Sequence, residues 1–136
     1  MSDINTEEVM PDTEQEPVIP RMKLSEAISQ ADELRPNAIE SKMKAAWLAE
    51  LDCGVAELLN VEPPVNDWPK DRELLMPEPK TTFYVYYLCA MIDYYLREVN
   101  LYYNDIELFQ SAYEDACGWY RRNNPKNRFY GNWRVM

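Results

Sequence analysis

Apolar residues recur at helical spacing through most of this chain, and the first two runs predict two helices. The first is a short amphipathic helix over residues 25–34, which Pro36 ends, with an apolar face made of Leu24, Ala27, Ile28, Ala31 and Leu34. Asn37 and Glu40 have the pattern of an N-cap with its supporting carboxylate, so they predict a second helix that ends near Asn60. Its apolar stripe contains Met43, Trp47, Leu48, Leu51, Val55, Leu58 and Leu59.

Residues 61–80 interrupt the helical pattern with five prolines: Pro63, Pro64, Pro69, Pro77 and Pro79. Proline lacks an amide donor and disfavours helix in the residue before it, so this segment is predicted to be a connector. Trp68 and the run Leu74 to Met76 are too apolar for a solvated loop. We therefore expect an ordered segment packed over the helices, with a short strand near residues 73–76.

Aromatic residues crowd the next part of the chain, between Phe83 and Tyr120. A stripe that begins after Thr82 predicts a long third helix reaching Tyr102 or Tyr103. Asn104 marks the predicted break, either as a turn before a fourth helix or as a kink in a single helix. The pattern then continues with Ile106, Phe109, Tyr113, Cys117 and Tyr120.

These patterns together predict an all-α protein, a small helical bundle of about four helices with a long aromatic-rich helical hairpin and a proline-rich connector. The expected organisation is an acidic N-terminal arm over residues 1–21, a helical domain over residues 22–124 and a basic aromatic C-terminal tail over residues 125–136. Both arms are expected to be extended, and the composition of the acidic N-terminal arm cannot bury enough apolar surface for it to fold alone.

The charge is unevenly distributed along the chain. The formal net charge is −10; residues 1–20 hold six acidic and no basic residues, and the last sixteen hold five basic and no acidic residues. This leaves −9 for residues 21–120. An acidic body repels nucleic acid and membrane surfaces, so only the short tail could approach a phosphate backbone.

Little in the sequence suggests an enzyme. Histidine is absent and only three glycines occur, so the usual general base, the commonest metal ligand and a phosphate-binding loop are missing. No catalytic residue, metal site or cofactor is predicted. Two carboxylate pairs, Asp52 with Glu57 and Asp93 with Glu98, are expected to be solvated, because a spacing of five does not place both on one helix face. The cysteines are expected to be reduced, buried and structural: Cys53, Cys89 and Cys117.

The paired tyrosines and the tail are the candidate contact residues. Neighbours on a helix point about 100 degrees apart, so each tyrosine pair is expected to place one ring inward and one outward. Tyr87, Tyr94 and Tyr103 are the predicted subunit-interface residues. The tail could stack on single-stranded nucleic acid or insert into the groove of a protein partner; its predicted anchors are Arg128, Phe129, Tyr130, Trp133, Arg134, Val135 and Met136.

Several segments within residues 22–124 resemble the head-to-tail connector (adaptor) proteins of tailed bacteriophages and prophages. Those segments are Leu24 to Ile28, Leu34 to Asn37, Lys44 to Asp52, Glu73 to Pro79, Ile92 to Tyr94 and Tyr103-Asn104. The resemblance implies a structural virion protein, not an enzyme, in which many copies form a ring beneath the portal. That ring matches the twelvefold symmetry of the portal, extends the DNA channel and joins the capsid to the tail.

The same resemblance implies partners and a location. The segment from Arg128 to Met136 would dock on the portal protein, and copies of the chain would contact one another within the ring. A tail or stopper protein would follow, and DNA would pass through the channel without specific binding. The expected location is the neck of the virion, with the host cytoplasm as the place of assembly and no membrane association.

Two other functions fit parts of the sequence. A pI near 4.5 and a small size are typical of a phage-encoded inhibitor that mimics the charge of DNA and blocks a host nuclease or regulator. The basic tail and the abundant aromatic residues count against this alternative. A third possibility is that the tail binds DNA directly, with an affinity that falls steeply with salt.

Overall fold

A computed structural model describes residues 20–124, and within this range the chain forms four helices and two short strands. The expected mostly helical fold is therefore confirmed. In chain order the elements are β1 (Arg21–Lys23), α2 (Leu24–Leu34), α3 (Ser41–Leu59), β2 (Glu73–Pro77), α4 (Thr82–Tyr95) and α5 (Val99–Arg122).

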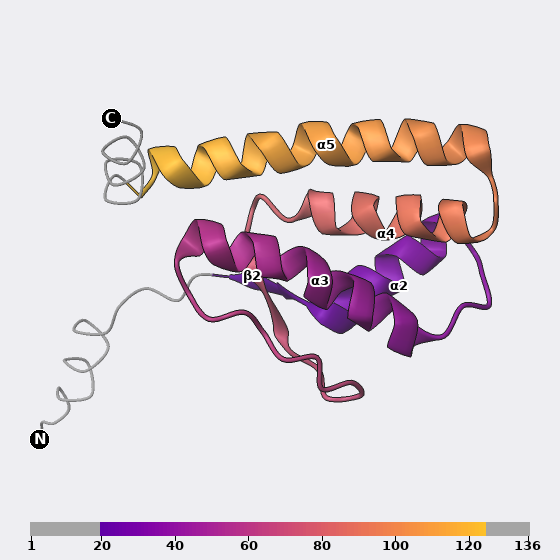
Figure 1. The fold of residues 1–136 in the computed structure, drawn as a ribbon, viewed down its shortest axis with the longest axis horizontal. Coiled ribbons are helices and arrows are strands. Elements are labelled where there is room, and N and C mark those ends of the chain that lie inside the picture. The colour runs from indigo at the N-terminus through magenta and orange to yellow at the C-terminus, as the bar shows by residue number, and fades with distance from the viewer. Residues whose placement is uncertain (1–19, 125–136) are drawn as a thin grey trace, which may run out of the picture.

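Helix α4 lies at the centre of the fold, with α5 along one side and α2 and α3 along the other (Figure 1). A central helix contacts neighbours on most of its sides, so it is apolar nearly all round. The buried residues of α4 show this: Phe83, Tyr84, Val85, Leu88, Cys89, Ala90, Ile92 and Asp93. Helix α2 contributes one apolar face of Leu24, Ala27, Ile28 and Ala31, whereas Leu34 is exposed.

The two strands form a small antiparallel sheet. Arg21 pairs with Pro77 and Lys23 pairs with Glu73. The strand predicted at residues 73–76 is confirmed as β2, but its partner β1 was not predicted, because three residues are too few to show an alternating pattern. The sheet places residues 73–77 against the first turn of α2, where the Leu24 amide donates to the Arg72 carbonyl at 2.8 Å.

Helix α3 begins later than the capping pattern predicted. Its N-cap is Glu40, whose carbonyl accepts from the Met43 amide at 3.1 Å. The Asn37 side chain instead accepts from the Ile39 amide at 2.9 Å and donates to Asp32 at 3.0 Å. Asn37 therefore orders the loop between α2 and α3 and does not cap a helix.

The break between the last two helices also lies elsewhere than predicted. Asn104 is inside α5, and the chain reverses at residues 96–98, where Arg97 has a φ of 63°. The Glu98 amide donates to the Asp93 carbonyl at 2.8 Å and the Arg97 amide to the Tyr94 carbonyl at 3.1 Å. This pair of bonds is the Schellman motif, which usually has glycine at the left-handed position. The prediction failed because arginine occupies that position here.

The cysteines differ in their surroundings. Cys89 and Cys117 are buried as expected, and burial raises the pKa of both thiols, that of Cys89 to about 11. Cys53 is exposed, so the expectation that it is buried was wrong. It follows Asp52 on α3, and consecutive helical residues point in different directions.

Candidate interaction surface

Exposed apolar side chains gather at the turn between α4 and α5. Their exposed fractions are 67% for Tyr94, 54% for Tyr95, 43% for Leu96, 58% for Val99 and 65% for Tyr103. We call these five residues the tyrosine surface. Contiguous exposed apolar residues mark contact sites more often than scattered ones, and tyrosine is enriched in protein interfaces.

Two hollows flank the tyrosine surface. The larger has a volume of about 880 Å³, and its walls are Asp93, Tyr94, Tyr95, Arg97, Glu98, Val99, Tyr102 and Tyr103. The smaller, of about 440 Å³, lies toward the start of α3 and is lined by Ala38, Ile39, Glu40, Met43, Tyr95 and Leu96. Tyr95 lines both hollows, and Leu96 lines the smaller one. This part of the turn therefore forms a ridge between the two hollows. We call the larger hollow the tyrosine groove.

Ring contacts fix the walls of the groove. The Tyr102 ring lies 5.5 Å from the Tyr94 ring and 5.6 Å from the Tyr103 ring, measured between centroids. On the other side of the ridge, Tyr95 lies 6.5 Å from Trp47 of α3. Tilted rings at these separations attract one another, so the groove is shaped before any partner binds.

The structure brings two of the three predicted interface residues together. Tyr94 and Tyr103 both line the tyrosine groove. Tyr87 lies elsewhere: it is half-buried, its ring is 5.1 Å from that of Phe109 on α5, and burial raises its pKa. The expectation of one ring inward and one outward fails for Tyr94 and Tyr95, which are both exposed. Helix α4 ends at Tyr95, so neighbouring helices no longer cover it.

An arginine that follows α2 binds carboxylates on both sides of this turn. Arg35, which follows α2, donates from Nε to Asp93 Oδ1 at 3.1 Å and from Nη2 to Asp105 Oδ2 at 2.8 Å. The carboxylate side chains are only 1% and 5% exposed. The cluster thus joins the ends of α2 and α4 to the second turn of α5, and Asp93 also forms part of the wall of the groove.

The arginine cluster has one carboxylate more than its positive charge can balance. Two carboxylates that share a site cannot both ionise easily, because each repels the other and both are poorly solvated. Desolvation and the neighbouring Asp105 raise the pKa of Asp93 to about 7, against the opposing effect of Arg35. The pair therefore retains a proton through mildly acidic pH.

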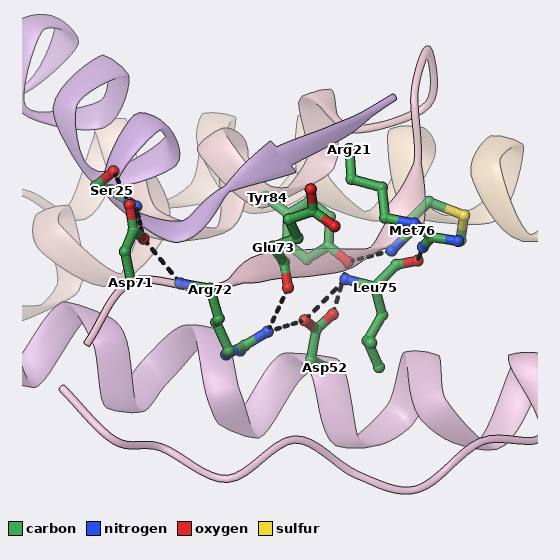
Figure 2. Close-up of polar contacts among 9 residues, drawn as sticks. All are labelled: Arg21, Ser25, Asp52, Asp71, Arg72, Glu73, Leu75, Met76 and Tyr84. Carbon is green, nitrogen blue, oxygen red and sulfur yellow. Dashed lines mark hydrogen bonds and ion pairs between the residues drawn. The ribbon is translucent and has the colours of Figure 1, made fainter. Parts of the chain in front are cut away.

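A second buried cluster lies between α3, β2 and the start of α4 (Figure 2). Asp52 of α3 points toward β2, where its Oδ2 accepts from Arg72 at 3.0 Å and from the Leu75 amide at 3.2 Å. Its Oδ1 accepts from the Tyr84 hydroxyl at 2.6 Å, and that hydroxyl in turn accepts from the Met76 amide at 2.9 Å. Asp52 thereby fastens α3, β2 and α4 together.

The hydrogen bonds of the Asp52 cluster have a structural role. Burial raises the pKa of Asp52 above its ordinary value, and the bonds from Tyr84 and Arg72 oppose only part of that rise. Burial and the Asp52 charge raise the pKa of Tyr84 far above its ordinary value, so the hydroxyl stays protonated and donates. The Asp52 side chain is completely buried, and it does not line any of the hollows described above.

The expectation that Asp52 and Asp93 are solvated was wrong. The sequence held a usable signal for Asp52, since it lies four residues after Leu48 and three before Val55 and therefore on the apolar face of its helix. Asp93 likewise lies four residues after Cys89. The other carboxylates of those two pairs, Glu57 and Glu98, are exposed, as expected.

The predicted tail anchors, from Arg128 to Met136, lie outside the described residues, as does almost all of the acidic arm. Within residues 20–124, no group of three or more potential ligand side chains could hold a metal ion. None of the helices in this range is long and apolar enough to cross a membrane. No protein-family model, curated protein or solved structure matches the chain.

Proposed function

We propose that this chain is a structural virion protein, a head-to-tail adaptor that forms a ring beneath the portal of a tailed phage or prophage. In this proposal α4 and α5 form the aromatic-rich hairpin, and residues 61–80 form the proline-rich connector. The ring extends the DNA channel and joins the capsid to the tail.

The observation that carries the proposal is the concentration of exposed apolar residues at one end of a small helical bundle. A monomeric protein of this size has no need to expose Tyr94, Tyr95 and Tyr103 around a preformed groove. Lateral contacts between copies would cover these rings. Ring assembly also multiplies the strength of individually weak contacts.

The charge distribution supports the same function. Residues 21–120 carry a net charge of −9, so a channel lined by this surface would repel DNA and let it slide. The basic aromatic tail follows α5 directly. Arginine, tyrosine and tryptophan are the residues that most often anchor protein interfaces, so the tail suits docking into the portal.

The first experiment is mass spectrometry of virions purified from the encoding phage, with copy number referenced to the portal protein. One copy per portal subunit is the expected result. Absence from virions together with abundance in the infected-cell lysate would refute the adaptor and favour the acidic inhibitor.

A second experiment tests the tail. Deletion of residues 128–136 should leave a folded protein that no longer sediments with portal particles, and the far-ultraviolet circular dichroism spectrum would check the fold. The matched control keeps the length of the tail and replaces Asn127 and Asn132 by serine. Retained sedimentation of the deletion variant would refute docking through the tail.

A further inference from the structure

The exposed part of the connector offers a second apolar feature. Residues 61–65 read Val-Glu-Pro-Pro-Val, and Val61 and Val65 are 49% and 75% exposed. Both valines lie between α3 and β2, outside the helices. Pro63 and Pro64 restrict the backbone of this segment to extended, polyproline-like conformations, so little entropy is lost when it binds.

The tyrosine groove has the chemistry that receives such a segment. Proline-rich segments dock in grooves lined by aromatic rings, because the flat rings pack against the pyrrolidine faces. Four tyrosines line this groove: Tyr94, Tyr95, Tyr102 and Tyr103. Val99 supplies an aliphatic floor that suits a valine side chain.

One charge pair is available to the same contact, in a groove wall that also holds the carboxylates of Asp93 and Glu98. The groove wall includes Arg97, whose side chain forms no ion pair with another residue of the described range. The segment carries Glu62 between its two apolar ends. An arginine beside the groove and a glutamate within the segment are complementary. The N-terminal arm is a poor alternative occupant, because its six acidic residues meet a body that is itself acidic.

A single chain cannot place its own segment in its own groove. Val65 lies in a hollow with Leu24, the first residue of α2, whereas Arg35 follows the last residue of α2 and binds Asp93 in the groove wall. The eleven residues of α2 separate the two features by about 16 Å. A segment of this kind in the groove would therefore come from another copy.

We infer that the tyrosine groove binds residues 61–65 of a second copy of this chain. This inference rests on the proposed ring and names its lateral contact. The two contact surfaces are different patches of the same chain, so the contact is heterologous and repeats from copy to copy. A heterologous contact closes into a ring when its rotation allows, as an adaptor requires.

The test uses two variants that each damage one half of the contact. Tyr103→Arg blocks the groove and Val65→Asp places a charge in the segment; both side chains are well exposed, so the fold should tolerate the changes. Leu108→Arg is the matched control, because Leu108 is exposed on α5 and lines neither hollow. Sedimentation velocity of the full chain is measured up to about 1 mM, where weak specific contacts are occupied.

The wild type and Leu108→Arg are expected to form a series of assemblies larger than a dimer, and each of the other variants alone should be monomeric. An equal mixture of Tyr103→Arg and Val65→Asp should form a dimer and nothing larger. In that dimer, one intact groove holds one intact segment, while both free ends are blocked. A wild type that stays monomeric would overturn the inference, as would a Val65→Asp variant that assembles like the wild type.

The charge contact has its own check. Arg97→Glu and Glu62→Arg should each weaken assembly by roughly tenfold, as for one close charge pair. The mixture of these two single variants should recover assembly, because every contact between unlike copies pairs opposite charges. The double variant, with both charges exchanged, should recover assembly, and failure to recover would overturn the pairing of Arg97 with Glu62.

These outcomes are separate from those of the adaptor proposal. A chain that assembles through groove and segment but is absent from virions would retain this inference and refute the adaptor. A virion protein with one copy per portal subunit whose Val65→Asp variant still assembles would retain the adaptor and refute the inference.

Discussion

Asp52 and Asp93 are both buried carboxylates that bind an arginine, yet they hold their charge differently. The Asp52 carboxylate accepts from Arg72, from the Tyr84 hydroxyl and from the Leu75 amide, so its charge is matched within the cluster. Asp93 must share the single charge of Arg35 with Asp105. The Asp52 cluster is thus balanced in charge, whereas the Arg35 cluster beside the tyrosine surface has one carboxylate more than its arginine can balance.

This difference is seen in the pKa values of the two carboxylates. Burial raises the pKa of Asp52, but the bonds from Tyr84 and Arg72 oppose that rise, whereas Asp93 shares its arginine with a second carboxylate and its pKa is raised to about 7. The groups that act on the Asp93 carboxylate come from the end of α2, from α4 and from α5: Arg35, Cys89 and Asp105. Of these, Arg35 alone is a cation.

The largest expected effect comes from removing the charge of the balanced cluster. Asp52→Ala leaves the Arg72 guanidinium and the Tyr84 hydroxyl without their buried partner, so the free energy of unfolding should fall by about 3–5 kcal/mol. Urea denaturation followed by circular dichroism measures this change. A loss of this size leaves the variant folded at low temperature when the wild type is stable enough, and partly unfolded in buffer when it is not.

Glu57→Ala is the matched control for this change. Glu57 is an exposed carboxylate on the same helix, and its removal should alter the free energy of unfolding by less than about 0.5 kcal/mol. Equal effects from the two variants would show that the buried contacts of Asp52 add no net stability.

The second prediction concerns pH at the unbalanced cluster. An aspartate in the unfolded chain ionises near pH 4, whereas the native pKa of Asp93 is about 7. Between these values the native state holds a proton that the unfolded state has released. The free energy of unfolding should therefore fall as pH rises from about 4 to about 7, by at most about 1.4 kcal/mol per pH unit, and this contribution stays constant above that window.

Asp93→Asn removes this titration while keeping a side chain that can bond to Arg35 and Asp105. Its stability should depend less on pH between about 4 and 7 than that of the wild type, as measured by thermal melts at matched ionic strength. Glu107→Gln, which changes an exposed carboxylate on α5, is the control and should keep the slope of the wild type. An unchanged slope in Asp93→Asn would assign the titration to another group.

The helices were predicted from the sequence more accurately than the turns between them and the residues at which they begin. The stripes of α2 and α3 located those helices because many apolar residues repeat the same signal. The turn at Arg97 and the start of α3 at Glu40 each depend on a few local hydrogen bonds, and neither has the residue type that usually marks it. The two buried clusters were missed because their partners come from segments 20 to 70 residues away, which spacing along one helix cannot reveal.

The tyrosine surface was predicted only in part, for a similar reason. The sequence pattern identified Tyr94 and Tyr103 as contact residues, but it placed the break after them. With the turn at residues 96–98, both rings lie at the end of the bundle, where no helix covers them. The position of one left-handed residue therefore decides which aromatic rings are exposed.

The third prediction tests how much the Tyr84 hydroxyl contributes to the stability of the Asp52 cluster. Tyr84→Phe keeps the ring, which stacks on Phe83 at 4.2 Å, but removes the donor to Asp52 and the acceptor of the Met76 amide. The free energy of unfolding should fall by about 1–2 kcal/mol, since two buried polar groups lose a partner. Tyr86→Phe, at a half-buried tyrosine on the same helix, is the control. A smaller loss in the Asp52→Ala background than in the wild type would confirm that the two groups act together.

The smallest effect is expected at an ion pair that is exposed. Lys80 Nζ lies 2.7 Å from Asp115 Oδ2, shorter than the contacts of Arg35 with Asp93 and of Arg72 with Asp52. Solvent screens this pair, so Lys80→Ala should leave the midpoint of thermal unfolding unchanged within error at neutral pH. The bond from Lys80 lowers the pKa of Asp115, so any contribution is present above the unfolded pKa and is lost as pH falls through the native one. A measurable loss at pH 7 would mean that short distance decides the strength of these pairs. No change, beside a large loss in Asp52→Ala, would mean that burial decides it.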